Sequence, residues 1–208
     1  DIFVTCSHRL MRVYREYERT STAVIDASIK PIMHRYLETL NDDLTQNDFN
    51  GHFLLTRSGG GAMTYDAAKD RPAHLVLSGP AGGVIGASGL ADLFGHRDLI
   101  TLDMGGTSLD ASLIIDGNAS ITNDARFQDL PITLPTIDLT TIGAGGGSIG
   151  WIDDGGHLQI GPQSAGAIPG PACYGNGGAD ATFTDAALAA GYLDPTNFLG
   201  GKISLDLN

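Results

Sequence analysis

The chain has 208 residues with 24 acidic and 12 basic side chains, which gives a formal net charge of −12. That charge argues against a nucleic-acid partner, because binding a phosphate backbone requires a basic surface, but it is compatible with a mononucleotide held by backbone N–H groups and a metal ion. No apolar run reaches the roughly 20 residues that span a bilayer, and the two cysteines lie far apart in the sequence, so we expect a cytoplasmic protein without a disulfide framework or membrane contact.

The first predicted element is a helix over residues 20–46. Its apolar residues recur at steps of three and four, as expected for one buried helix face. Pro31 interrupts this pattern and should kink the helix or divide it in two. The chain begins on "DIFVT" without a methionine, and we expect it to be part of a longer polypeptide.

Each of the next two segments is predicted to be a strand followed by a glycine-rich turn. "HFLLTRSGGG" (52–61) is an apolar run stopped by glycines, typical of a strand entering a loop. Residues 74–77 are predicted as a second strand, followed by a glycine turn and a helix over about 82–94.

The second half is predicted to consist mainly of β-hairpins. Residues 98–121 indicate two strands joined by a loop, then a hairpin turn at Asp116–Gly117 and a third strand. Residues 147–161 repeat this form with a turn at 154–156, and a short helix follows near 184–191. The mixture predicts an α/β fold, with β-hairpins in a mixed sheet and flanking helices. We expect a single domain over 1–208, with 162–208 as its Gly/Pro-rich extension.

Three glycine loops are the candidate binding elements: "SGPAGG" (78–83), "DMGGTSLD" (103–110) and "GAGGGS" (143–148). Glycine allows positive φ and close approach of the backbone to a ligand, and successive N–H groups can form an anion-binding nest. Where a helix follows, as after the first loop, its N-terminal amides add to the attraction for anions.

The second loop also carries carboxylates and hydroxyls. Asp103 ends an apolar strand, where a carboxylate is costly unless a cation or hydrogen-bond donors accompany it. Mg²⁺ held through water and phosphate oxygens would be such a partner. Thr107 and Ser108 can donate hydroxyls to phosphate, and Asp110 can orient the loop or a water molecule.

Each loop also has a purely structural interpretation. An Asp-x-Gly-Gly-Thr sequence is often a simple turn, and "SGPAGG" can be a tight connection into a helix. "GAGGGS" resembles half of a dinucleotide fingerprint, but a strand pattern follows it where that fingerprint requires a helix. The absence of a Walker A sequence excludes a P-loop NTPase.

Residues outside the loops provide weaker candidates. Cys173 is either a nucleophile, a metal ligand or an inert thiol. Asp138 is either a supporting carboxylate or the cap of a turn. The six histidines are scattered without the spacing of a zinc site.

Six longer segments resemble the hydantoinase A/5-oxoprolinase family in sequence and order. They are "EYERTSTAVIDA" (16–27), "LSGPAGGVIGA" (77–87), "DMGGTSLDASLI" (103–114), "TIGAGGGSIGWID" (141–153), "GPQSAGAIPGPACYGNGG" (161–178) and "TDAALAAGYLDPTNFLGG" (184–201). The resemblance implies a ribonuclease H-like lobe of the actin, sugar kinase and heat-shock ATPase superfold. It also implies ATP and Mg²⁺ as cofactors and a hydantoinase B-type partner, either a separate subunit or a fused domain.

By this resemblance the full-length protein is an ATP-dependent hydrolase that phosphorylates the oxygen of a cyclic amide before the ring opens. The chemistry requires positioning and charge neutralisation more than covalent catalysis. The implied catalytic residues are Asp103 and Asp110, with Asp103 also the metal ligand. The implied nucleotide-binding residues are Gly105, Gly106, Thr107, Ser108, Ser78, Gly79, Gly82, Gly83, Gly143, Gly145, Gly146, Gly147 and Ser148.

Two departures from the family pattern leave alternatives open. Leu109 stands where members commonly have Thr or Phe, and Thr140 stands where they commonly have His. These departures motivate a non-catalytic lobe that binds nucleotide or serves as a scaffold. The resemblance itself leaves open a second alternative, the subunit of an ATP-dependent ketone carboxylase. The 208 residues alone are expected to show no turnover, because a two-lobe cleft needs both lobes to exclude water.

Overall fold

The computed structural model describes residues 2–127 and 129–207 and shows a mixed α/β protein with several small sheets. The chain forms two compact units. Unit 1 contains the residues up to Thr101 together with Ser112–Leu139, and unit 2 contains Leu102–Ala111 together with the residues from Thr140 onward. The expectation that 1–208 forms a single lobe stays a prediction.

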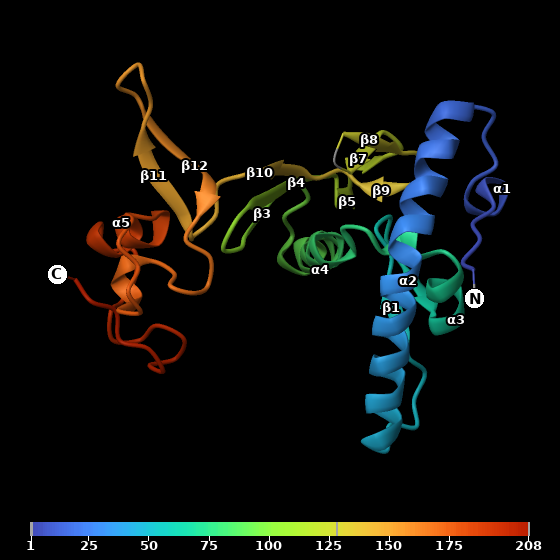
Figure 1. The fold of residues 1–208 in the computed structure, drawn as a ribbon, viewed down its shortest axis with the longest axis horizontal. Coiled ribbons are helices and arrows are strands. Elements are labelled where there is room, and N and C mark those ends of the chain that lie inside the picture. Colours follow the sequence, from blue (N-terminus) through green and yellow to red (C-terminus); the bar gives the residue numbers. More distant parts are fainter. Residues whose placement is uncertain (1, 128, 208) are drawn as a thin grey trace. The chain divides into compact units, whose positions relative to one another are not determined.

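Unit 1 is built around one long helix, α2, drawn in blue in Figure 1. Helices α1 and α3 and the 3₁₀ helix η1 pack against it, and α4 packs on strands β5 and β9. The bounds are α1 Ser7–Leu10, α2 Glu16–Gln46, α3 Tyr65–Asp70, η1 Pro72–Leu75 and α4 Ser78–Phe94.

The predicted helix over 20–46 is confirmed as α2, which begins earlier, at Glu16. Pro31 lies inside it and does not divide it. Ile25 and Leu37 are buried in separate clusters on either side of the proline, so tertiary packing holds both halves in place. Packing of this kind outweighs the one backbone hydrogen bond that proline removes.

The strands form short antiparallel pairs. Strand β4 lies between β10 and β3 and also pairs with β5; the other pairs are β1–β2, β6–β9, β7–β8 and β11–β12. The bounds are β1 Leu54–Thr56, β2 Ala62–Thr64, β3 Leu99–Met104, β4 Leu109–Ile115, β5 Asn118–Ala119, β6 Ile121–Thr122, β7 Ala125–Phe127, β8 Leu130–Ile132, β9 Thr136–Ile137, β10 Thr140–Ile142, β11 Ser148–Ile152 and β12 Leu158–Ser164. In unit 2, η2 spans Ala172–Tyr174 and α5 spans Phe183–Ala189.

Both predicted hairpin turns are confirmed. Asp116 and Gly117 have φ values of 54° and 78°, the positive pair expected of a two-residue type I′ turn between β4 and β5. Residues between Ile152 and Leu158 connect β11 to β12 in the second hairpin. The short helix expected near 184–191 is α5.

The strand predicted at 74–77 is wrong, and so is the late start of the helix after it. Residues Pro72–Leu75 form η1, and α4 already begins at Ser78. Pro72 presets a helical φ at the start of η1, and Leu77 then reverses the chain with a φ of 63°. The glycines of "SGPAGG" therefore lie in the first turns of α4, because the helix packs through Ala81 and Val84 against Ile114.

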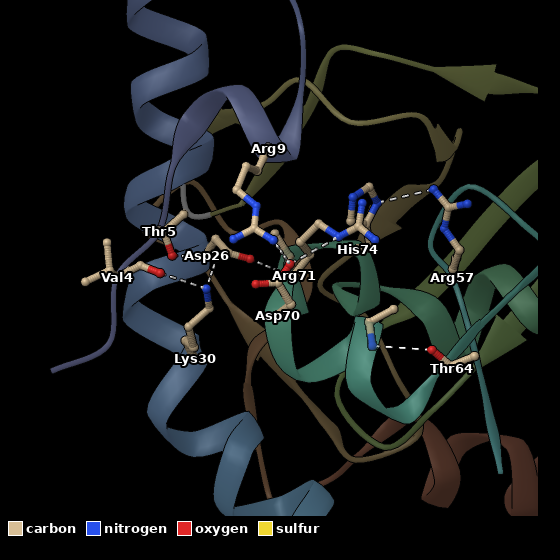
Figure 2. Close-up of polar contacts among 12 residues, drawn as sticks. Val4, Thr5, Arg9, Asp26, Lys30, Arg57, Thr64, Asp70, Arg71 and His74 are labelled. Atoms are coloured by element: carbon tan, nitrogen blue, oxygen red, sulfur yellow. Dashed lines mark hydrogen bonds and ion pairs between the residues drawn. The ribbon is translucent and has the colours of Figure 1, made fainter. Parts of the chain in front are cut away.

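A buried polar network ties the N-terminal segment and η1 to α2 (Figure 2). Asp26 is fully buried, and its carboxylate lies 3.2 Å from the Lys30 ammonium. The same carboxylate accepts hydrogen bonds from the Thr5 hydroxyl, at 2.7 Å, and from the Ala73 N–H, at 3.0 Å. Lys30 also donates to the Val4 carbonyl. Both ions of the buried pair therefore have hydrogen-bond partners besides each other, as buried charges require.

His74 lies in the same region with its ring turned toward Arg57 (Figure 2). Burial lowers the pKa of His74 from 6.5 to about 4, and the positive charges of Arg57 and Arg71 act in the same direction. Its Nδ1 lies 3.4 Å from the Arg57 guanidinium, which can only donate, so Nδ1 accepts and the ring is neutral.

We expect His74 to make the chain less stable in mild acid. The unfolded state binds the proton first as the pH falls below 6.5, so stability is lost progressively down to the folded-state pKa of about 4. The full loss is about 3 kcal/mol. Urea unfolding of the wild-type chain and of His74→Gln at pH 7 and pH 4 should show a larger loss in the wild type. Equal losses would contradict this assignment.

Among the described residues, no helix is long and apolar enough to cross a membrane.

Candidate functional site

The loop between β3 and β4 is a tight hairpin that exposes its carboxylate. The Gly105 N–H donates to the Ser108 carbonyl at 2.9 Å and closes the turn. Asp103 is exposed near the end of β3, and its carboxylate has no hydrogen bond or ion pair with a described residue. We expected the Asp103 carboxylate, at the end of an apolar strand, to need a cation or hydrogen-bond donors. That expectation is wrong, because the side chain is exposed to solvent. The carboxylate is instead accessible to a cation from solution.

The hydroxyls of the hairpin are similarly available. Thr107 is exposed and Ser108 is half-buried. Neither hydroxyl has a hydrogen-bond partner among the described residues. Together with Asp103 they give the hairpin two donors and one anionic oxygen group for a ligand.

Asp110 is held in place by the neighbouring strand. It lies opposite Thr141 in the register of β4 and β10, and the Thr141 hydroxyl donates to its carboxylate at 2.5 Å. The neighbouring Thr140 lies opposite Ala111. The structure therefore gives Asp110 a fixed orientation at the start of β4.

The third glycine loop is docked directly on the hairpin. The Gly146 N–H donates to the Gly105 carbonyl at 2.9 Å, and the Gly147 N–H donates to the Gly106 carbonyl at 2.6 Å. A Cβ added at Gly145 would lie 2.6 Å from the backbone nitrogens of Thr107 and Ser108. Only glycine allows this approach.

These contacts occupy the N–H groups that were expected to face a nucleotide. Those of Gly146 and Gly147 donate to the hairpin, and that of Gly145 donates to the Ser148 hydroxyl at 2.8 Å. Ser148 is fully buried, whereas Gly143 at the start of the loop is exposed. The geometry therefore favours a supporting role for residues 145–148.

The first glycine segment belongs to the other compact unit. Ser78, Gly79 and Gly82 line a cavity of about 680 Å³ together with apolar residues of α2 and β1. Leu77 provides no side-chain cap for α4, and the first turn of any helix leaves N–H groups without intrahelical partners. The neighbouring Gly83 is exposed, with nothing within 4 Å of an added Cβ.

Cys173 and Asp138, the remaining candidates, lie in surroundings that favour a structural role. Burial, and then the nearby Asp185 carboxylate, raise the pKa of the Cys173 thiol to about 12, so it stays protonated at neutral pH and is a poor nucleophile. Asp138 is exposed, and its backbone carbonyl accepts from the Ser112 hydroxyl. No group of three or more His, Cys, Asp or Glu residues in the described part of the chain is arranged to hold a metal.

Thr184 contacts the third glycine loop, and Asp185 follows it at the start of α5. The sequence alone did not indicate either residue as part of the site. Thr184 donates to the Gly146 carbonyl through both its N–H, at 2.9 Å, and its hydroxyl, at 2.8 Å. Asp185 closes a capping box with Thr182 at the start of α5. The Thr-x-x-Asp spacing is a recognisable helix-start signal, but nothing in it indicates contact with a loop 38 residues away.

The hydantoinase/oxoprolinase family model matches residues 19–208. The chain belongs to this family. Among curated members, it is 42% identical to the caprolactamase subunit alpha of Pseudomonas jessenii over 99% of its own length and 30% of that protein. It is 36% identical to the 5-oxoprolinase of Saccharomyces cerevisiae over 94% of its length and 15% of that protein.

Solved structures of other members have the same backbone arrangement. The crystal structure of the ATP-dependent caprolactamase from Pseudomonas jessenii matches with a TM-score of 0.81 at 42% identity, covering 99% of this chain and 30% of that one. The nucleotide-free structure of acetone carboxylase, from work on ATP-dependent acetone carboxylation, matches with a TM-score of 0.81 at 32% identity, covering 97% and 28%. This hydantoinase/oxoprolinase chain thus spans about a third or less of the relatives that it matches.

Proposed function

We propose that this chain is the nucleotide-binding part of an ATP-dependent enzyme that opens a cyclic amide. The observation that carries the proposal is the β3–β4 hairpin. It presents the exposed Asp103 carboxylate and two hydroxyls that have no partner among the described residues, beside backbone that the third glycine loop holds in place. Hydrogen-bond donors and a carboxylate that can hold a metal ion are groups that phosphoryl transfer requires from a protein.

In this proposal the hairpin binds the phosphates of ATP. The hydroxyls of Thr107 and Ser108 donate to phosphate oxygens, and Asp110, oriented by Thr141, keeps the first residues of β4 in position. Asp103 suits Mg²⁺, which prefers carboxylate, water and phosphate oxygens and rarely needs a cage of protein ligands. When bound, Mg²⁺ would neutralise charge on the transferred phosphoryl group.

The reaction that we propose transfers the γ-phosphoryl group of ATP to the amide oxygen. Water then adds to the activated carbon and the ring C–N bond breaks, which releases the amine and leaves an acyl phosphate. A second water hydrolyses the acyl phosphate, so the products are ADP, phosphate and the ring-opened amino acid. The 42% identity to a caprolactamase subunit supports a cyclic amide as substrate.

A ketone carboxylase is the second candidate, and a specific match favours it. The chain is 33% identical to the acetophenone carboxylase gamma subunit of Aromatoleum aromaticum over 98% of its length. The same phosphorylation step would then act on a ketone oxygen before bicarbonate-derived carbon is added.

The fold and the assembly belong to the same proposal. We assign the chain to a ribonuclease H-like lobe of the actin, sugar kinase and heat-shock ATPase superfold, which binds nucleotide between two lobes. We also expect a hydantoinase B-type partner in the cytoplasm, as a subunit or a fused domain. Three relatives, named as alpha, gamma and beta subunits, support an assembly of this kind.

Substrate-stimulated ATP hydrolysis tests the proposal. The complete protein with its partner should release ADP faster when a cyclic amide such as a hydantoin, oxoproline or caprolactam is added. Stimulation only by a ketone with bicarbonate would instead establish the carboxylase. Binding of ATP without stimulation by either class would indicate a non-catalytic nucleotide-binding lobe, and no binding at all would refute the nucleotide site.

A further inference from the structure

The β3–β4 hairpin (residues 103–110) is held in position by residues that lie outside it. The Gly105 N–H bond to the Ser108 carbonyl closes the turn that joins β3 to β4, and residues 103–107 are exposed. A short exposed loop of glycines has high conformational entropy unless other groups fix it. In unit 2, residues 145–147 supply those groups through two backbone hydrogen bonds and the close approach at Gly145.

The third glycine loop is fixed in turn by α5. The Gly146 carbonyl accepts two hydrogen bonds, both from Thr184, one from its N–H and one from its hydroxyl. Thr184 is buried, with 8% of its surface exposed. A Cβ added at Gly146 would lie 3.0 Å from the Thr184 hydroxyl, so the two residues are in tight contact.

Helix α5 is short, and an acidic side chain anchors its start. The Asp185 carboxylate accepts from the N–H and hydroxyl of Thr182, at 2.7 and 2.8 Å, and from the Cys173 N–H at 2.8 Å. Burial acts to raise the pKa of Asp185, but the hydrogen bonds from Cys173 and Thr182 outweigh it and lower the pKa to about 2. The carboxylate is therefore ionised at neutral pH, and it holds Thr184 in a fixed place.

We propose that Thr184 is a positioning residue for the phosphate-binding hairpin, acting through Gly146 on Gly105. This inference rests on the proposed function and deepens it. The chain of contacts runs from Asp185 to Thr184, to the Gly146 carbonyl, and from the Gly146 N–H to the hairpin. The third glycine loop serves as a backbone clamp between α5 and the hairpin, and the nucleotide contacts belong to the hairpin itself.

The test compares Mg·ATP binding by the complete protein with that of variants at Thr184. Thr184→Val keeps the shape and the backbone N–H but removes the hydroxyl bond. We expect its dissociation constant for Mg·ATP to rise about fivefold, the equivalent of one hydrogen bond. The KM for ATP should rise similarly while kcat changes little, and Thr184→Ser should restore wild-type binding.

A second variant addresses the clamp directly. Gly145→Ala places a methyl group against the hairpin backbone, so we expect it to weaken Mg·ATP binding more than Thr184→Val does. The matched control is Gly89→Ala in α4, where an added Cβ meets nothing within 4 Å. That control should bind Mg·ATP as the wild type does.

The outcomes separate this inference from the function on which it rests. If Asp103→Asn loses Mg·ATP binding while Thr184→Val and Gly145→Ala retain it, the hairpin binds phosphate and the positioning role is refuted. A lowered melting temperature of Thr184→Val with unchanged nucleotide affinity would also overturn it, since that is what a purely structural role predicts. If the wild-type protein does not bind Mg·ATP, the proposed function and the inference fall together.

Discussion

Replacing Asp103 by asparagine should abolish substrate-stimulated ATP hydrolysis in the complete protein. The change removes the one negative charge of the hairpin that is exposed and unpartnered among the described residues. Loss of a preorganised electrostatic contact of this kind lowers kcat by roughly 10²–10³. We expect a loss at least that large, because the metal-bound phosphates would lose their protein anchor.

The stability of Asp103→Asn should match that of the wild type, since the carboxylate makes no hydrogen bond or ion pair with any residue in the described part of the chain. Thermal unfolding checks this point, and Asp154→Asn provides the matched control. Asp154 is also exposed in unit 2, but it lies in the turn between β11 and β12. Normal turnover by Asp103→Asn would show that the hairpin carboxylate has no part in catalysis.

Asp26→Ala should destabilise the chain by about 3–5 kcal/mol, the usual effect of removing one partner of a buried ion pair. Lys30 would keep its charge with only 6% of its side chain exposed, and the Ala73 N–H would lose its acceptor. Because whole-protein stability is commonly 5–15 kcal/mol, this loss is a large fraction of it. Urea unfolding at neutral pH measures the effect.

The double variant Asp26→Ala/Lys30→Met separates the two causes. It should recover part of the stability lost in Asp26→Ala, because the unpaired ammonium is gone while the Thr5 and Ala73 donors remain unsatisfied. As a surface control, Glu38→Ala breaks the exposed ion pair with Lys69 and should have a much smaller effect. A similar loss in Asp26→Ala and Glu38→Ala would contradict the assignment of a buried, coupled pair.

Much of the local structure follows from short sequence signals. The Asp116–Gly117 dipeptide predicts a type I′ turn because both positions require positive φ, and the structure has that turn. The three- and four-residue spacing of apolar side chains likewise predicts most of α2. These signals succeed because each depends on backbone preferences within a few residues.

Errors arise where a local signal competes with packing. The apolar residues before "SGPAGG" read as a strand, yet Pro72–Leu75 form η1 and the glycines enter α4. Glycine disfavours helix interiors by only about 1 kcal/mol per residue, so the burial of Ala81 and Val84 can override it. Asp103 shows the same limit, because its apolar neighbours suggested burial and the folded strand leaves it exposed.

In the candidate site, too, local features could be predicted from the sequence and long-range contacts could not. The sequence alone was enough to find the hairpin, with its carboxylate, glycines and hydroxyls, because these residues are adjacent and their chemistry is local. The partners of the hairpin came only with the folded chain. Gly146 reaches Gly105 across 41 positions and Thr184 reaches Gly146 across 38, and no periodicity or spacing encodes contacts between backbone groups so far apart. Long-range hydrogen bonding and packing placed three similar glycine loops in three different settings: an exposed hairpin, a loop docked on that hairpin, and the first turns of a helix.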